Sequence, residues 1–164
     1  MTENARPALH PNAQKVAAAL DSVGVPGQVR ELNDPARTAE EAAALLDIEV
    51  GAVCNSLIFD ADGAPLLVLT SGAHRADTTI LASLVNATHV RRATPDFVRE
   101  ATGQPIGGVS PVGHPAPITT IVDIALSNFD AVWAAGGHPH YVFPTTYAEL
   151  LRITGGTSAV VSES

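Results

Sequence analysis

Apolar positions recur along the chain with two periods, one typical of helices and one typical of strands. Apolar residues three or four positions apart, or alanine- and leucine-rich runs after a capping residue, predict helices over residues 12–23, 39–47, 78–86, 95–102 and 147–154. Alternating or continuous apolar runs predict strands over residues 28–32, 52–59, 65–70, 88–92, 118–124, 131–135, 140–143 and 158–161.

Capping signals define the starts of these helices. Thr38 and Thr146 each precede a glutamate by three residues. In this capping-box arrangement the hydroxyl accepts from the backbone and the glutamate reaches back toward the cap. The other helices are expected to start at side chains that accept from the first free N–H groups, which are Asn12, Asp77 and Thr94.

The order of the elements indicates the fold class. Residues 60–63 (Asp-Ala-Asp-Gly) predict a turn that joins strands 52–59 and 65–70 into a hairpin. Single helices separate other strands, without the regular strand–helix alternation of a doubly wound sheet. We therefore expect an α+β fold around a largely antiparallel, barrel-like sheet with flanking helices.

The composition indicates one globular domain. The 164 residues are 46% hydrophobic and 4% aromatic, so aliphatic side chains must form the core. We expect a single domain over residues 1–164, with a flexible N-terminal segment over residues 1–11. Cys54 is the only cysteine, which excludes an intrachain disulfide. No apolar run approaches the roughly 20 residues of a membrane span, and no secretory signal is visible, so we expect a cytoplasmic protein without membrane contact.

The charge distribution limits the ways in which this chain could bind nucleic acid. Its formal net charge is -8, which disfavours binding by broad phosphate neutralisation. Only residues 74–99 carry a basic excess, from four arginines against two aspartates. The candidates there for phosphate contacts are Arg75, Arg91 and Arg92, and an ordinary solvated surface is the alternative explanation.

Five segments together carry a more specific signal. They are residues 38–43 (Thr-Ala-Glu-Glu-Ala-Ala), 54–59 (Cys-Asn-Ser-Leu-Ile-Phe), 101–113 (Ala-Thr-Gly-Gln-Pro-Ile-Gly-Gly-Val-Ser-Pro-Val-Gly), 135–143 (Ala-Gly-Gly-His-Pro-His-Tyr-Val-Phe) and 149–155 (Glu-Leu-Leu-Arg-Ile-Thr-Gly). In this order they resemble the YbaK/prolyl-tRNA-synthetase-associated editing-domain family of aminoacyl-tRNA deacylases. The resemblance implies a single-domain mixed α/β fold whose curved sheet holds one pocket. It also implies hydrolysis of the ester between a wrong amino acid and the 3′-terminal adenosine of tRNA.

The glycine-rich loop is the first candidate part of a site. Its glycines let a ligand approach backbone N–H groups, and a proline stiffens it. Preorganised N–H donors of this kind can stabilise an ester oxygen that gains negative charge. A structural turn is the alternative. The resemblance assigns the family's Gly-x-x-x-Pro substrate loop to Gly107, Gly108, Val109, Ser110 and Pro111.

The turn between the strands 131–135 and 140–143 is the second candidate. A histidine beside an ester could hold a water or a hydroxyl, and the resemblance assigns Gly137 and His140 to the family's Gly-x-x-His position. His138 and His140 also have the spacing of a metal pair on a strand. The remaining possible ligands lack metal-site spacing, so we expect no metal; they are His114, Asp123 and Cys54. No nucleotide-cofactor motif is present either, so we expect no cofactor.

Asn55 is the clearest departure from the family pattern, which implies a lysine at this position. Asparagine is a neutral donor and acceptor, whereas lysine would supply a positive charge. The only lysine, Lys15, lies far upstream. In a strand Asn55 shares a face with Val53 and Leu57, so its amide needs either a ligand or a backbone partner. Cys54 points the other way and is expected to be a small buried side chain rather than a nucleophile.

Three hypotheses follow. The first is a trans-acting deacylase of tRNA mischarged with a small amino acid, in which Asn55 orients the water; its partners are the aminoacylated 3′ end of tRNA and a synthetase or another translation protein. Small apolar amino acids fit because binding alone discriminates poorly among them. The second, favoured by Asn55, is a non-catalytic module that holds an aminoacyl-adenosine-like or other small ligand. The third is a metal hydrolase built on His138, His140 and Cys54.

Overall fold

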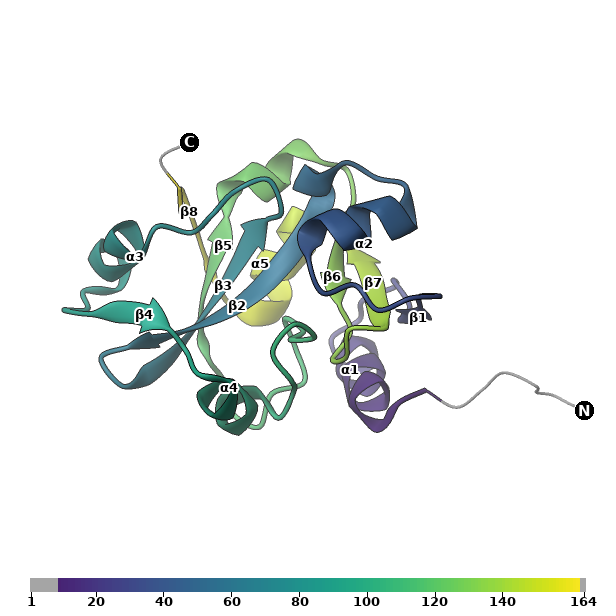
Figure 1. Ribbon diagram of the computed structural model, residues 1–164, viewed down its shortest axis with the longest axis horizontal. Coiled ribbons are helices and arrows are strands. Elements are labelled where there is room, and N and C mark those ends of the chain that lie inside the picture. Colours follow the sequence, from purple (N-terminus) through teal and green to yellow (C-terminus); the bar gives the residue numbers. More distant parts are fainter. Residues whose placement is uncertain (1–8, 163–164) are drawn as a thin grey trace, which may run out of the picture.

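The computed structural model of the chain describes residues 9–162. Residues 1–8 of the segment expected to be flexible therefore lie outside the described residues. The described chain forms five α-helices around one sheet (Figure 1). The helices are α1 (Pro11–Ser22), α2 (Ala39–Leu46), α3 (Thr78–Val85), α4 (Pro95–Thr102) and α5 (Tyr147–Thr154). Each forms within one or two residues of its predicted range.

The strands also form at the predicted places, although several are shorter than predicted. They are β1 (Arg30–Glu31), β2 (Val53–Ala61), β3 (Ala64–Ser71), β4 (Val90–Arg92), β5 (Thr119–Asp123), β6 (Val132–Ala135), β7 (Tyr141–Thr145) and β8 (Thr157–Ala159). Two short 3-10 helices, η1 (Val50–Ala52) and η2 (Ile124–Asn128), precede β2 and follow β5.

The helix caps show how far local signals reach. The hydroxyls of Thr38 and Thr146 accept from the backbone N–H three residues later, at 3.1 Å in each case. Glu41 instead reaches one residue beyond the cap and accepts from the N–H of Arg37 at 2.8 Å. The prediction that Asn12 caps α1 is wrong: His10 is the cap, and its Nδ1 accepts from the N–H of Asn12 at 3.1 Å.

The sheet combines antiparallel and parallel pairs. Its order is β1-β7-β6-β2-β3-β5-β8, and β4 pairs with β2 outside this path. The predicted hairpin of β2 and β3 is antiparallel, whereas the pairs β2–β6, β3–β5 and β5–β8 are parallel. This confirms the mixed α/β fold.

Both faces of the sheet are covered. One face of the central hairpin carries Cys54 and Ile58, which join the largest apolar cluster together with residues of α1, α4 and α5. The opposite face carries Phe59, which packs with Leu81 of α3, and Val53, which packs against α2. Figure 1 shows α2 in front of the sheet and α5 behind it.

The decisive feature of the sheet is an opening along one edge of β2. β3 pairs with the other edge from Cys54 onward. On the open side β6 pairs with β2 at Val53 and Cys54, and β4 pairs with it from Phe59 to Ala61. Within residues 9–162, residues 55–57 therefore have no strand beside them on this edge.

The helices of residues 9–162 are too short or too polar to span a membrane.

Asp123, at the end of β5, ties three elements together. Its buried carboxylate accepts from the N–H of Ser71 at 3.0 Å and from the N–H of Ala125 at 2.9 Å. Its Oδ2 also lies 3.2 Å from Nδ1 of His74. The carboxylate thus caps η2 and links the end of β3 to β5.

Replacing Asp123 by alanine should lower the free energy of unfolding by about 3 kcal/mol, because a buried N–H and the His74 ring lose their acceptor. Urea unfolding of Asp123→Ala beside Asp130→Ala measures this, since Asp130 is exposed and serves as the control. Equal stability of the two variants would contradict this role of Asp123.

Candidate functional site

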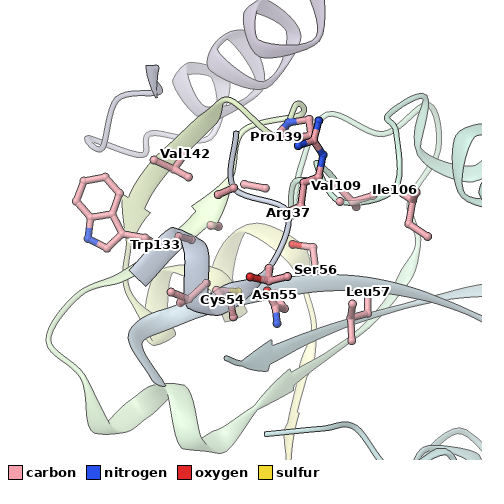
Figure 2. Close-up of a pocket in the computed structure, with 18 of the residues that line it drawn as sticks. Arg37, Cys54, Asn55, Ser56, Leu57, Ile106, Val109, Trp133, Pro139 and Val142 are labelled. Carbon is pink, nitrogen blue, oxygen red and sulfur yellow. The ribbon is translucent and has the colours of Figure 1, made fainter. Parts of the chain in front are cut away.

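A pocket of about 520 Å³ occupies the opening beside β2. Residues 53–58 of β2 all line it (Figure 2). Because successive residues of a strand point to opposite faces, a pocket lined by consecutive residues must wrap around the strand edge. The other walls are α2 with the residues before it, the segment after α4, and the strands β6 and β7.

The predicted glycine loop and the predicted histidine turn lie against each other. A Cβ atom on Gly108 would stand 2.7 Å from Cα of His138. No side chain fits at that distance, so glycine is required for this close approach. Gly107 has a φ of +88°, a conformation that also favours glycine. The two loops that the sequence singled out thus form one wall.

The backbone N–H groups of this loop are used alternately. Those of Gly108 and Ser110 donate to the carbonyl of Pro105 at 3.0 Å and to Oε1 of Gln104 at 2.7 Å. Those of Gly107 and Val109 have no partner within residues 9–162. Gly107 and Val109 are also the loop residues that line the pocket. Val109 is itself a buried residue, and its unpaired N–H is available to a ligand in the pocket.

Ser110 and Pro111 support this loop from behind. Both are buried and neither lines the pocket. The Ser110 hydroxyl accepts from the N–H of Val112. The backbone carbonyl oxygen of Ser110 lies 2.7 Å from Nε2 of His114. Burial lowers the pKa of His114, which favours a neutral ring that donates to this carbonyl. Together with Gln104, these contacts hold the loop in one shape.

Asn55 lies at the free edge with its side chain unpaired. It is half-buried and lines the pocket. Its amide makes no hydrogen bond within the described residues. Of the two explanations open from the sequence, a backbone partner is therefore not what the structure shows. The amide is available to a ligand.

Ser56 is a polar residue of the pocket that the sequence analysis did not single out. Its hydroxyl is buried and has no hydrogen-bond partner in the described part of the chain. Figure 2 shows Asn55 and Ser56 leaving β2 on opposite sides, with Ser56 directed toward Val109. The alternation of the strand predicts this opposite direction, but only the strand edge explains why both residues line one pocket.

The pocket is positively charged although the protein is acidic. Arg37 and Arg92 line it, and no aspartate or glutamate among the described residues does so. Both arginines are exposed, and Arg92 also stacks over the ring of Phe59 at 5.9 Å. Arg91 instead faces Asp60 at 3.4 Å, and neither it nor Arg75 lines the pocket. Arg37 was missed, because only the tertiary structure brings the start of α2 to β2.

The histidine turn contributes its backbone and neighbours rather than its imidazoles. Gly137, His138 and His140 do not line the pocket, whereas Pro139 and Tyr141 do. The ring of His138 lies 4.5 Å from that of His10 and 5.5 Å from that of His140. Partial burial, followed by repulsion from these two rings, lowers the pKa of His138.

Cys54 has the properties of a core residue. Burial, followed by the nearby carboxylate of Asp123, raises the pKa of its thiol to about 12. A thiol with such a pKa carries almost no nucleophilic thiolate at neutral pH. Among residues 9–162 there is also no group of three side chains placed to hold a metal ion.

Comparisons with known proteins agree with this geometry. A model of the aminoacyl-tRNA editing domain matches residues 33–153. The chain is 33% identical over 128 residues to a proline–tRNA ligase of Nitratidesulfovibrio vulgaris and 32% identical over 120 residues to one of Geobacillus kaustophilus. These matches cover 78% and 73% of this chain but 21% and 20% of the ligases. The chain thus spans about a fifth of the length of these relatives.

A solved structure extends the match to nearly the whole chain. It is described as a candidate trans-editing enzyme for prolyl-tRNA synthetase, and it superposes with a TM-score of 0.90 at 42% identity. The superposition covers 96% of this chain and 100% of the other. The fold and the family resemblance expected from the sequence are both confirmed. The chain belongs to the aminoacyl-tRNA editing domain family.

Proposed function

We propose that this chain is a trans-acting deacylase, which hydrolyses the ester between a small amino acid and the 3′-terminal adenosine of tRNA. The observation that carries the proposal is the set of unpaired polar groups around one pocket, namely the N–H groups of Gly107 and Val109 and the side chains of Asn55 and Ser56. The two arginines of the pocket suit the phosphates of a tRNA end. The likeness to a candidate trans-editing enzyme supports action apart from a synthetase.

The reaction needs a water and a place for negative charge. Water attacks the ester carbonyl carbon, and the carbonyl oxygen becomes an oxyanion. The N–H groups of Gly107 and Val109 are the donors that would stabilise it. Collapse breaks the bond to the ribose oxygen, which takes the proton that the water gives up. The products are a free amino acid and a tRNA with its terminal hydroxyl restored.

The residues of the pocket also limit how the water is activated. Within the described chain no carboxylate or histidine lines the pocket, so we assign no general base to a side chain there. We assign the orientation of the water to the neutral amide of Asn55, with help from the 2′-hydroxyl of the terminal ribose. Ser56 supplies a second neutral contact to the substrate from the opposite side of β2.

Three further sequence expectations belong to this proposal. Gly108, Ser110 and Pro111 keep the loop in the shape that presents its free N–H groups. Gly137 and His140 act through the wall that their turn forms with Gly108. A synthetase is proposed as a partner because the matched relatives are proline–tRNA ligases.

Purified protein incubated with a panel of mischarged tRNAs should release at least one small amino acid faster than buffer does. The panel should include glycyl-, alanyl-, valyl- and prolyl-esters on the same tRNA, with a family deacylase run in parallel. Release is measured from the loss of labelled aminoacyl-adenosine. If the parallel enzyme works and this protein accelerates no ester, the deacylase assignment fails.

Substitution of Asn55 separates the deacylase from the non-catalytic binding module. In a deacylase, Asn55→Ala should lower kcat/KM by about 100-fold, because it removes a donor from the reacting groups. The natural chain should then hydrolyse the ester already, before Asn55→Lys is introduced. Activity that appears only in Asn55→Lys would instead support the binding module.

Removal of either pocket arginine should raise KM and leave kcat nearly unchanged, because these side chains would contact phosphates rather than the ester. Each of Arg37→Ala and Arg92→Ala should also reduce the salt slope of log KM by about 0.7, as expected for one contact to a single strand. Arg75→Ala and Arg91→Ala in the same assay test whether contacts extend beyond the pocket. Unchanged KM in both pocket variants would exclude the phosphate role.

A further inference from the structure

Thr70 of β3 lies directly opposite Asn55 of β2. The antiparallel register pairs these two residues, just as it pairs Leu57 with Val68. Residues paired in this way point to the same face of the sheet, with Cβ atoms about 5 Å apart. The hydroxyl of Thr70 is therefore a polar neighbour of the Asn55 amide on the face that also carries Leu57.

The Thr70 hydroxyl is one of two buried hydroxyls of the sheet that have no hydrogen-bond partner within residues 9–162; the other is that of Ser56. Thr70 is 0% exposed, and its Oγ1 has no hydrogen-bond partner within the described residues. Other buried hydroxyls are paired: that of Ser71 donates to the carbonyl of Gly51 at 2.8 Å, and that of Thr120 donates to the carbonyl of Ile118 at 2.8 Å. A buried polar group without a partner is unfavourable. Its position beside a second unpaired group needs an explanation.

We propose that Thr70 is a positioning residue for Asn55, an inference that rests on the proposed deacylase function. When a substrate occupies the pocket, the Thr70 hydroxyl donates to Oδ1 of Asn55. This bond fixes the amide plane and turns Nδ2 toward the substrate. Asn55 then donates an N–H to the ester or to the attacking water.

The chemistry of the two groups favours this direction of the hydrogen bond. If Nδ2 donated to Thr70 instead, the hydroxyl proton would still lack an acceptor in a buried site. Unsatisfied donors are rarer in proteins than unsatisfied lone pairs. With Oδ1 facing Thr70, both hydroxyl proton and amide oxygen are satisfied, and only the NH2 group is left for the substrate.

The arrangement supplies a donor without a charge. An amide that rotates freely presents its N–H groups to the reacting atoms for only part of the time. A fixed amide presents them continuously, which is the advantage of preorganisation in catalysis. No proton is transferred between Thr70 and Asn55, because the hydrogen bond only orients the amide.

The test compares Thr70→Val, which keeps the shape and removes the hydroxyl, with Thr70→Ser, which keeps the hydroxyl. Thr70→Val should lower kcat about tenfold with little change in KM, and Thr70→Ser should stay near the natural rate. In an Asn55→Ala background, Thr70→Val should have no further effect, because the group that it orients is gone.

Stability gives an independent readout. Thr70→Val should unfold at the same or a higher urea concentration than the natural chain, because the lost hydroxyl has no partner in the free protein. Thr120→Val is the matched control: it should lose stability through the lost bond to Ile118 and should leave kcat unchanged. Lower stability of Thr70→Val would show that the hydroxyl has a structural partner and would overturn the proposal.

The kinetic result can overturn it in two further ways. Natural kcat in Thr70→Val, or a loss that persists in the Asn55→Ala background, would show that Thr70 does not act through Asn55. If the natural protein hydrolyses no ester, the proposed function fails. The hydrogen bond between Thr70 and Asn55 is then tested separately, by titrating 3′-alanylamino-3′-deoxyadenosine against the natural protein and against Thr70→Val. Weaker binding of this amide to Thr70→Val than to the natural chain would support the pairing, and equal affinity would overturn it.

Discussion

The pairing of β2 with two different strands along a single edge is the constraint on which the site depends. β6 covers the start of this edge and β4 covers its end, so the middle of the strand stays open. A strand paired with residues 55–57 would have closed this edge. Here Asn55 and Ser56, which face opposite sides of the sheet, both reach one pocket instead. Because of this opening, Asn55 and Ser56 line the same pocket although they point to opposite faces of the sheet.

Close contact between two loops builds the opposite wall. Gly108 packs on the backbone of His138, and a Cβ atom would prevent this contact. The internal hydrogen bonds of Gln104 and Ser110 stabilise the same loop from within. As a result only some of its N–H groups are committed to the fold, and those of Gly107 and Val109 remain unpaired. The wall is held by these hydrogen bonds and by a close backbone contact, and it still offers donors.

The charge of the pocket differs from that of the chain. A net charge of -8 would repel a polyanion, but the pocket carries Arg37 and Arg92 and, within the described residues, no carboxylate. Such a distribution of charge suits the binding of the end of a nucleic acid strand in the pocket better than the binding of an extended nucleic acid surface. Asn55 adds a neutral donor and acceptor to this pocket, whereas Arg37 and Arg92 supply its charge.

The sequence by itself determined the local elements and the segments that contain the site. Capping threonines, a tight turn and glycine stops act over a few residues, so the helices and the central hairpin could be predicted. The sequence also singled out Asn55 and residues 107–111 as candidate site residues. Only the tertiary structure decided that Gly107 and Val109 line the pocket while Ser110 supports it, and that Arg37 and Ser56 belong to it. It also replaced Asn12 by His10 as the cap of α1. These outcomes depend on strand order and on contacts between residues far apart in the chain, which no local pattern encodes.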